Sequence, residues 1–304
     1  MITILLFTGC GRKVTEEEAR QALHNHLIER YGEEFEIGYM GLRLLDAEVW
    51  FQGEIYPAKY KGTPRENDKY YHRTGTVDIK KGIFGEKISF VGDVYSKVLL
   101  NESANEFYLP KLKELFGENV LPIFDIKVSK MAVKPDFYTT YKTRQSEGKK
   151  VIISGGIYIF GRVENDEDRE KYREEIYKFL SFMKETGTFE YVDLDIIVID
   201  DRELISNPRK LLENLSNDLS TDEWRKQRRI LMKAGNKEFS DMSQEEISQK
   251  ISLINKGEYL KEFYGGLLGI KVYSPKYIKS QGLDNREVRE YNSITDVKFD
   301  WEMW

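Results

Sequence analysis

Helical and strand-like patterns of apolar residues alternate along residues 15–199. Thr15 and Glu18 match a capping box, apolar residues then recur at helical spacing as far as Tyr31, and Gly32 ends the pattern. The apolar runs that follow predict strands at 35–45, 48–60, 76–80 and 87–100. The first part of the chain therefore predicts one helix followed by several strands.

The same order returns twice. A second helical pattern begins at Ser103 and ends at Gly117, before a strand-like run at 123–131. A third begins at Asn165 and ends at Gly187. We expect the apolar stripe of the third helix to pack on the strand that follows it; the stripe is Tyr172, Ile176, Phe179, Leu180 and Met183, and the strand residues are Val192, Leu194, Ile196 and Val198.

These patterns predict an α+β fold, with helices packed on curved antiparallel sheets, because long strand-rich stretches between helices favour hairpins over crossovers. The helix-glycine-strand order suggests repeated units, although glycine ends many helices in its left-handed conformation. We expect one α+β domain over 11–133, a polar linker over 134–150, and a second α+β domain over 151–304 with a helical insert at 206–256.

Composition narrows the classes of protein. Apolar residues make up 40% of the 304 residues, which is enough to fill real cores and argues against global disorder. Charged residues are frequent but nearly balanced, with a net charge of −5, so we do not expect nucleic acid as a main partner. Cys10 is the single cysteine, which excludes an internal disulfide framework.

The first ten residues, MITILLFTGC, form a short uncharged apolar run that ends in Cys10. Phe7-Thr8-Gly9-Cys10 resembles the lipobox of bacterial lipoprotein signal peptides, in which a large apolar residue and two small residues precede the cysteine; Phe7 stands where the family usually has Leu. The resemblance implies that residues 1–10 are a signal peptide ending at a lipidated Cys10. The protein would then be anchored by lipid to the extracytoplasmic side of a cell membrane.

The alternative reading of this segment is a buried first strand at 2–7 of a cytosolic α/β protein. Gly9 and Gly11 would then belong to the turn after the strand, but Val14 stands where a dinucleotide-binding fingerprint needs its third glycine. A basic segment encoded upstream of Met1 would favour the lipoprotein, since such signal peptides begin with positive charge.

Few residues point to catalysis. His24 and His26 are two positions apart on the predicted helix, so they point away from each other and cannot chelate one metal; we expect His26 to be partly buried and hydrogen-bonded. Asp200 and Asp201 follow an apolar strand and are the candidate metal ligands for a hydrolase. Asp193 and Asp195, on that same strand, should share one of its faces.

The sequence therefore predicts a lipid-anchored protein of the bacterial cell envelope with a binding or structural role, without a cofactor. Its expected partners are the membrane, through the lipid on Cys10, and an envelope protein as a candidate. An envelope metal-dependent hydrolase that uses Asp200 and Asp201 is the alternative, alongside the cytosolic α/β protein.

Overall fold

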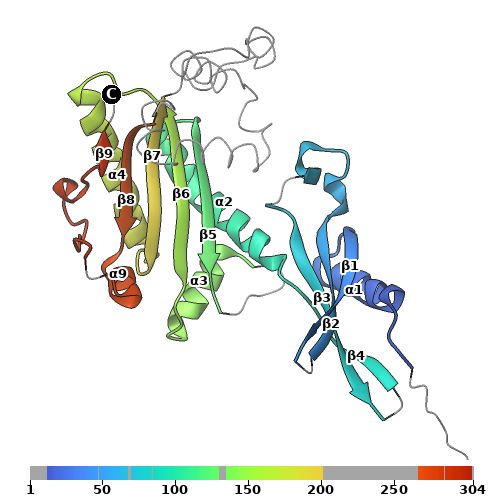
Figure 1. Ribbon diagram of the computed structural model, residues 1–304. Helices are drawn as coiled ribbons and strands as arrows, with labels where there is room; N and C mark the ends of the chain where they lie inside the picture. Colours follow the sequence, from blue (N-terminus) through green and yellow to red (C-terminus); the bar gives the residue numbers. More distant parts are fainter. Residues whose placement is uncertain are drawn as a thin grey trace, which may run out of the picture. The chain divides into compact units, whose positions relative to one another are not determined.

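The computed structural model describes residues 12–46, 48–67, 70–83, 85–129, 135–200, 266–283 and 285–302 (Figure 1). The fold is α+β, as predicted, with two sheets of four and five strands. The chain divides into two compact units, Met1–Val98 and Leu99–Trp304. The division differs from the expected domains, and the expected linker at 134–150 contains helix α3 (Phe137–Ser146), whose Phe137 and Tyr141 are buried in the core of the second unit.

The first unit places helix α1 (Glu16–Tyr31) on one face of an antiparallel sheet. The strands β1 (Phe35–Leu45), β2 (Glu48–Pro57), β3 (Arg73–Gly82) and β4 (Gly85–Asp93) pair in sequence order. Two short 3-10 helices, η1 (Ala58–Tyr60) and η2 (Pro64–Asn67), lie between β2 and β3. Each strand is joined to its neighbour without a crossover, so this unit is a four-stranded meander.

Helix α1 begins and ends where its sequence predicts. Thr15 and Glu18 form the capping box, and Gly32 takes the left-handed conformation at the end of the helix. Ala19, Leu23 and Leu27 are fully buried against the sheet. A Cβ atom at Gly75 would lie 2.7 Å from Leu23 Cδ2, so this glycine lets the helix approach β3 closely.

The second unit is built on a mixed sheet. Its strands are β5 (Val120–Lys127), β6 (Ile152–Gly161), β7 (Val192–Asp200), β8 (Gly266–Tyr273) and β9 (Trp301–Glu302), paired in that order. The pair β6 and β7 is parallel and is connected through α4 (Asp166–Glu185), whereas the other pairs are antiparallel. The remaining helices of this unit are α2 (Ser96–Phe116), α3, α9 (Pro275–Gln281) and the short η5 (Ile294–Asp296).

The predicted packing of the third helix is confirmed. Ile176, Phe179, Leu180 and Met183 of α4 are fully buried in one core, which also contains Val192, Leu194, Ile196 and Val198 of β7, and Tyr172 packs against it. Helices α2 and α4 lie on the same side of the sheet in Figure 1. This side is the apolar one, because β7 directs Leu194, Ile196 and Val198 into the core. In the first half of the strand, Asp193 and Asp195 alternate with these residues and lie on the other face.

Helix α2 departs from its predicted bounds. The strand predicted at 87–100 ends at Asp93, and the helix begins at Ser96 rather than near Ser103. Leu100, Ala104, Tyr108 and Leu112 are all fully buried at a spacing of four residues, so Leu100, the last residue of the predicted strand, is the first of these four buried residues of the helix.

The helix-glycine-strand order is present at all three predicted sites. Gly32, Gly117 and Gly187 have φ values of 70°, 82° and 69° and follow α1, α2 and α4. Strand order and direction nevertheless differ between the two sheets. The recurrence is therefore local, at the level of helix ends. The predicted helical insert at 206–256 lies outside the described residues.

Candidate functional site

The residues predicted to be lipidated or to bind metal lie at the edge of the described residues or outside them. Asp200 is the last residue of β7, whereas Cys10 and Asp201 lie outside the described residues. Within the described residues, no group of three or more histidine, cysteine, aspartate or glutamate side chains is placed to hold a metal ion. Each unit nevertheless has a cluster of charged and polar side chains, and the first unit also has an exposed apolar surface.

The first cluster lies on the second unit, on the face of the sheet that points away from the apolar core. Asp193 and Asp195 share this face of β7, as predicted, and Lys271 of β8 lies between their carboxylates. Lys271 Nζ is 3.1 Å from Asp195 Oδ2 and 3.6 Å from Asp193 Oδ1. The Tyr277 hydroxyl donates a 2.8 Å hydrogen bond to Asp193 Oδ2.

Burial and charge act in opposite directions on this cluster. Burial raises the pKa of Asp195, and the opposing effect of Lys271 does not bring that pKa back to its usual value. Burial lowers the pKa of Lys271, but Asp195 and Asp193 outweigh it and leave the pKa above its usual value. The Lys271 ammonium thus pairs with two carboxylates. We interpret this arrangement as a link between β8 and β7 rather than as a site for a metal cation.

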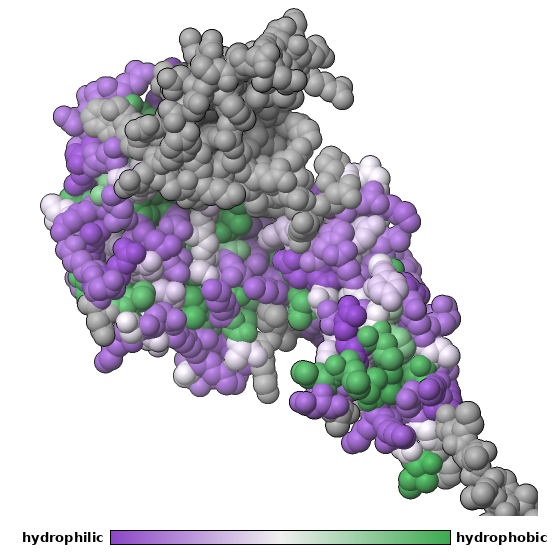
Figure 2. Space-filling view, viewed as in Figure 1, coloured by the Kyte–Doolittle hydropathy of each residue, from purple (hydrophilic) through white to green (hydrophobic). Residues whose placement is uncertain are grey.

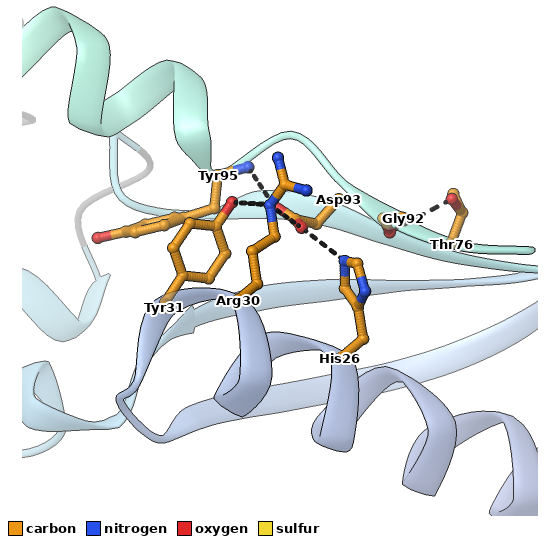
Figure 3. A network of polar contacts seen from close by, with 7 residues as sticks. All are labelled: His26, Arg30, Tyr31, Thr76, Gly92, Asp93 and Tyr95. Carbon is orange, nitrogen blue, oxygen red and sulfur yellow. Dashed lines mark hydrogen bonds and ion pairs between the residues drawn. The ribbon is translucent and has the colours of Figure 1, made fainter. Parts of the chain in front are cut away.

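The second cluster lies in the first unit and is centred on Asp93, the last residue of β4 (Figure 3). The Asp93 side chain has no exposed surface. Its Oδ1 accepts hydrogen bonds from the Tyr31 hydroxyl at 2.5 Å and from the Tyr95 backbone N–H at 2.8 Å. Its Oδ2 lies 3.1 Å from His26 Nε2 and 3.4 Å from Arg30 Nε.

The Asp93 cluster joins the end of α1 to the end of β4 and the residues just after it, which lie more than 60 positions further along the chain. His26, Arg30 and Tyr31 come from the last turns of α1, and Tyr95 precedes α2. Burial and the hydrogen bond to Asp93 raise the pKa of Tyr31 to about 12. Both oxygens of the carboxylate are engaged by protein groups, so we interpret this cluster as a structural tie between helix and sheet.

The two histidines of α1 lie as their sequence positions predict, and His72 has partners of its own. His26 is partly buried and faces Asp93. His24 is not part of the Asp93 cluster, and its Nε2 lies 3.7 Å from Glu34 Oε2. The ring of His72 stacks on Tyr56 with 4.6 Å between centroids, and its Nδ1 lies 3.1 Å from Glu54 Oε2. Each ring has its own partners, and the three do not form one site.

The third feature is the end of the first unit's sheet at which both hairpins turn. Leu45 pairs with Glu48 in the first turn, and Gly82 pairs with Gly85 in the second. Because Val49 of β2 pairs with Ile79 of β3, both turns lie at the same end of the sheet, which we call the hairpin end (Figure 1).

Arg12 and Val14, among the first described residues, lie at the hairpin end. Arg12 forms an isolated parallel bridge with Gly85, and the Glu86 N–H donates a 2.7 Å hydrogen bond to the Arg12 carbonyl. The Val14 N–H donates to Glu86 Oε2 at 3.0 Å. Gly85 has a φ of 118°, and a Cβ atom there would lie 2.5 Å from Arg12 N, so the contact depends on glycine.

The hairpin end is unusually apolar for a solvent-facing surface. Ile83 is 96% exposed, Leu44 72%, Leu45 62% and Leu42 56%. Figure 2 shows apolar residues gathered over the strands of the first unit. A groove of about 510 Å³ lies beside this surface, lined by Glu48, Val49, Trp50, Thr76, Asp78, Ile79, Lys80 and Ser89. Neither position in the sequence nor residue type marked this surface, which only the pairing of the strands brings together.

Comparison with protein-family models, curated proteins and solved structures finds no match to this chain. Among the helices within the described ranges, none combines the length and the apolar character needed to span a bilayer. Among the described residues, strand pairing and the exposure of apolar side chains mark the hairpin end as the candidate functional surface.

Proposed function

We propose that this chain is a lipid-anchored protein of the bacterial cell envelope with a binding or structural role. The observation that carries the proposal is the lipobox-like Phe7-Thr8-Gly9-Cys10, which contains the single cysteine of the chain. Arg12, two positions after Cys10, already pairs with Gly85 of the first unit. A diacylglyceryl group on the thiol would hold the first unit close to the membrane without a long tether.

The polar clusters support a role in binding or structure rather than catalysis. The Asp93 carboxylate is fully engaged by α1 and Tyr95, and Lys271 engages Asp193 and Asp195. A general acid or base must reach the proton that it transfers. Asp93 and Asp193 face groups of the protein instead, and Asp195, whose side chain is 42% exposed, is paired with Lys271.

The test is metabolic labelling with a clickable fatty acid in cells that express the chain from its native start. We expect label on the wild type and none on Cys10→Ser, which should also leave the membrane fraction. Equal melting temperatures of the two proteins would show that the variant is folded. Wild-type protein that carries no label would overturn the proposal.

Metal binding distinguishes the alternative, a metal-dependent hydrolase, from the lipid-anchored binding or structural protein. A micromolar metal site corresponds to about 8 kcal/mol of binding free energy and would raise the melting temperature of the full chain at saturating Mn²⁺ or Mg²⁺. A rise that Asp200→Asn abolishes would favour the hydrolase. We expect the melting temperature to stay unchanged.

A further inference from the structure

We infer that the hairpin end of the first unit rests on the lipid surface and fixes the orientation of the anchored protein. The inference rests on the proposed lipidation of Cys10. The hairpin end would be a second membrane contact, made by the first unit itself, and its binding partner would be the lipid bilayer.

Arg12, two positions after Cys10, lies at the hairpin end. Arg12 runs parallel to β4 beside Gly85, which is the first residue of that strand. From Arg12 to Val14 the chain therefore runs from the hairpin end toward the body of the sheet. Two extended residues span at most about 7 Å, so a lipid on Cys10 must lie close to this end of the sheet.

Apolar side chains are also exposed at the hairpin end. Leu44 and Leu45 lie at the first turn and Ile83 lies in the second, and all three are more than half exposed. The two hairpins are neighbours in the sheet, so their turns can meet one flat surface together. Exposed apolar turns are costly in water and are stabilised in the boundary between headgroups and acyl chains.

Charged residues of both signs surround those apolar residues. The cations are Arg12, Lys13, Arg43, Lys80, Lys81 and Lys87, and the carboxylates are Glu16, Glu17, Glu18, Asp46, Glu48, Asp78 and Glu86. Arg12 is paired with Glu18. Lysine side chains beside apolar residues suit the anionic headgroup region, because their stems lie along apolar surface while the ammonium stays hydrated.

The experiment uses the acylated full chain, in which a newly introduced cysteine is the only free thiol. An environment-sensitive nitrobenzoxadiazole probe is attached at Ile83→Cys or, as the control, at Thr63→Cys. Thr63 follows η1, beyond the opposite end of β2, and is exposed. Each protein is reconstituted into vesicles of phosphatidylethanolamine and phosphatidylglycerol that contain a spin-labelled lipid.

We expect the probe at residue 83 to shift to shorter wavelength and to be quenched on the order of five-fold more than the probe at residue 63. Leu44→Glu combined with Leu45→Glu should abolish that difference while the protein still floats with the vesicles. Tyr39→Glu, which replaces an exposed side chain on the same strand away from the turn, should preserve it.

The outcomes separate this inference from the proposed function. Equal, weak quenching at both positions in a protein that floats with the vesicles would overturn the inference and leave the lipid anchor intact. A chain without acyl label that does not float would overturn both. A spectral shift in native membranes but not in pure lipid would assign the hairpin end to an envelope protein and overturn the lipid contact.

Discussion

The Nε2 atom of His26 lies 3.1 Å from Oδ2 of Asp93, a carboxylate that has no contact with solvent and lies 67 positions further along the chain. The pair links α1 to the last residue of β4. A buried carboxylate is stabilised only when its oxygens are hydrogen-bonded or paired with charge. The stability of the first unit should therefore depend on Asp93 and its partners.

Asp93→Ala should destabilise the first unit by about 3–5 kcal/mol, since it leaves the Tyr31 hydroxyl, the Tyr95 N–H and the Arg30 guanidinium without their shared acceptor. Glu29→Ala, at an exposed position of α1, should change stability by less than about 0.5 kcal/mol. Calorimetric unfolding of the full chain measures both. Equal effects of the two substitutions would contradict the structural role of Asp93.

High pH should weaken the same cluster. The pKa of Tyr31 is about 12 in the folded protein, against an ordinary value of 10.0. Between these values the unfolded chain loses the phenol proton while the folded chain keeps it, so stability falls as pH rises from about 10 to 12.

Tyr31→Phe isolates this contribution. The stability advantage of the wild type over Tyr31→Phe should be fully present below pH 10 and should shrink by about 2 kcal/mol as the pH approaches 12. Denaturant titrations of both proteins at each pH measure the difference. A difference that stays constant across this range would show that Tyr31 titrates normally.

Phe179→Ala should destabilise the second unit by about 3–5 kcal/mol, because it opens a cavity under a fully buried side chain of α4. Lys171→Ala, on the exposed side of the same helix, should have little effect. Unfolding of the full chain by urea compares the two. A loss below about 1 kcal/mol for Phe179→Ala would place this helix face outside a packed core.

Gly155→Ala should also destabilise the second unit, by more than about 3 kcal/mol. Gly155 has a φ of 133°, and a Cβ atom there would lie 2.1 Å from the Ile123 carbonyl oxygen on β5. Gly148 also has a positive φ but has open space around it, so Gly148→Ala should cost only about 1–2 kcal/mol of backbone strain. Melting temperatures rank the two variants, and the reverse order would be inconsistent with the close β5–β6 pairing.

Sequence patterns predicted the elements whose ends are marked by neighbouring residues. Thr15, Glu18 and Gly32 act on their own helix, and β1 was predicted over its full length at Phe35–Leu45. The start of α2 was wrong because residues 95–100 are apolar enough for either a strand or a helix, and burial against the second core decides between them.

The clusters were harder to predict because they join residues that are far apart in sequence. Asp93 gives no local sign that it faces His26, and Asp195 gives none that it faces Lys271. Strand order decides both contacts, and pattern alone does not specify strand order. The alternation on β7 did predict that Asp193 and Asp195 share a face, since that relationship depends only on the two-residue period of a strand.

The different connections of the two sheets imply different times of folding. Neighbouring strands of the first sheet are consecutive in the chain, so this unit can complete its pairing once its last strand, which ends at Asp93, has been made. In the second sheet, β7 must wait for β8, since residues 201–265 lie between them. Pairing strands that are so far apart in the chain costs more entropy and slows the search for the partner strand. We expect the first unit to protect its amide protons from exchange early in refolding, and the β7–β8 pair to follow later.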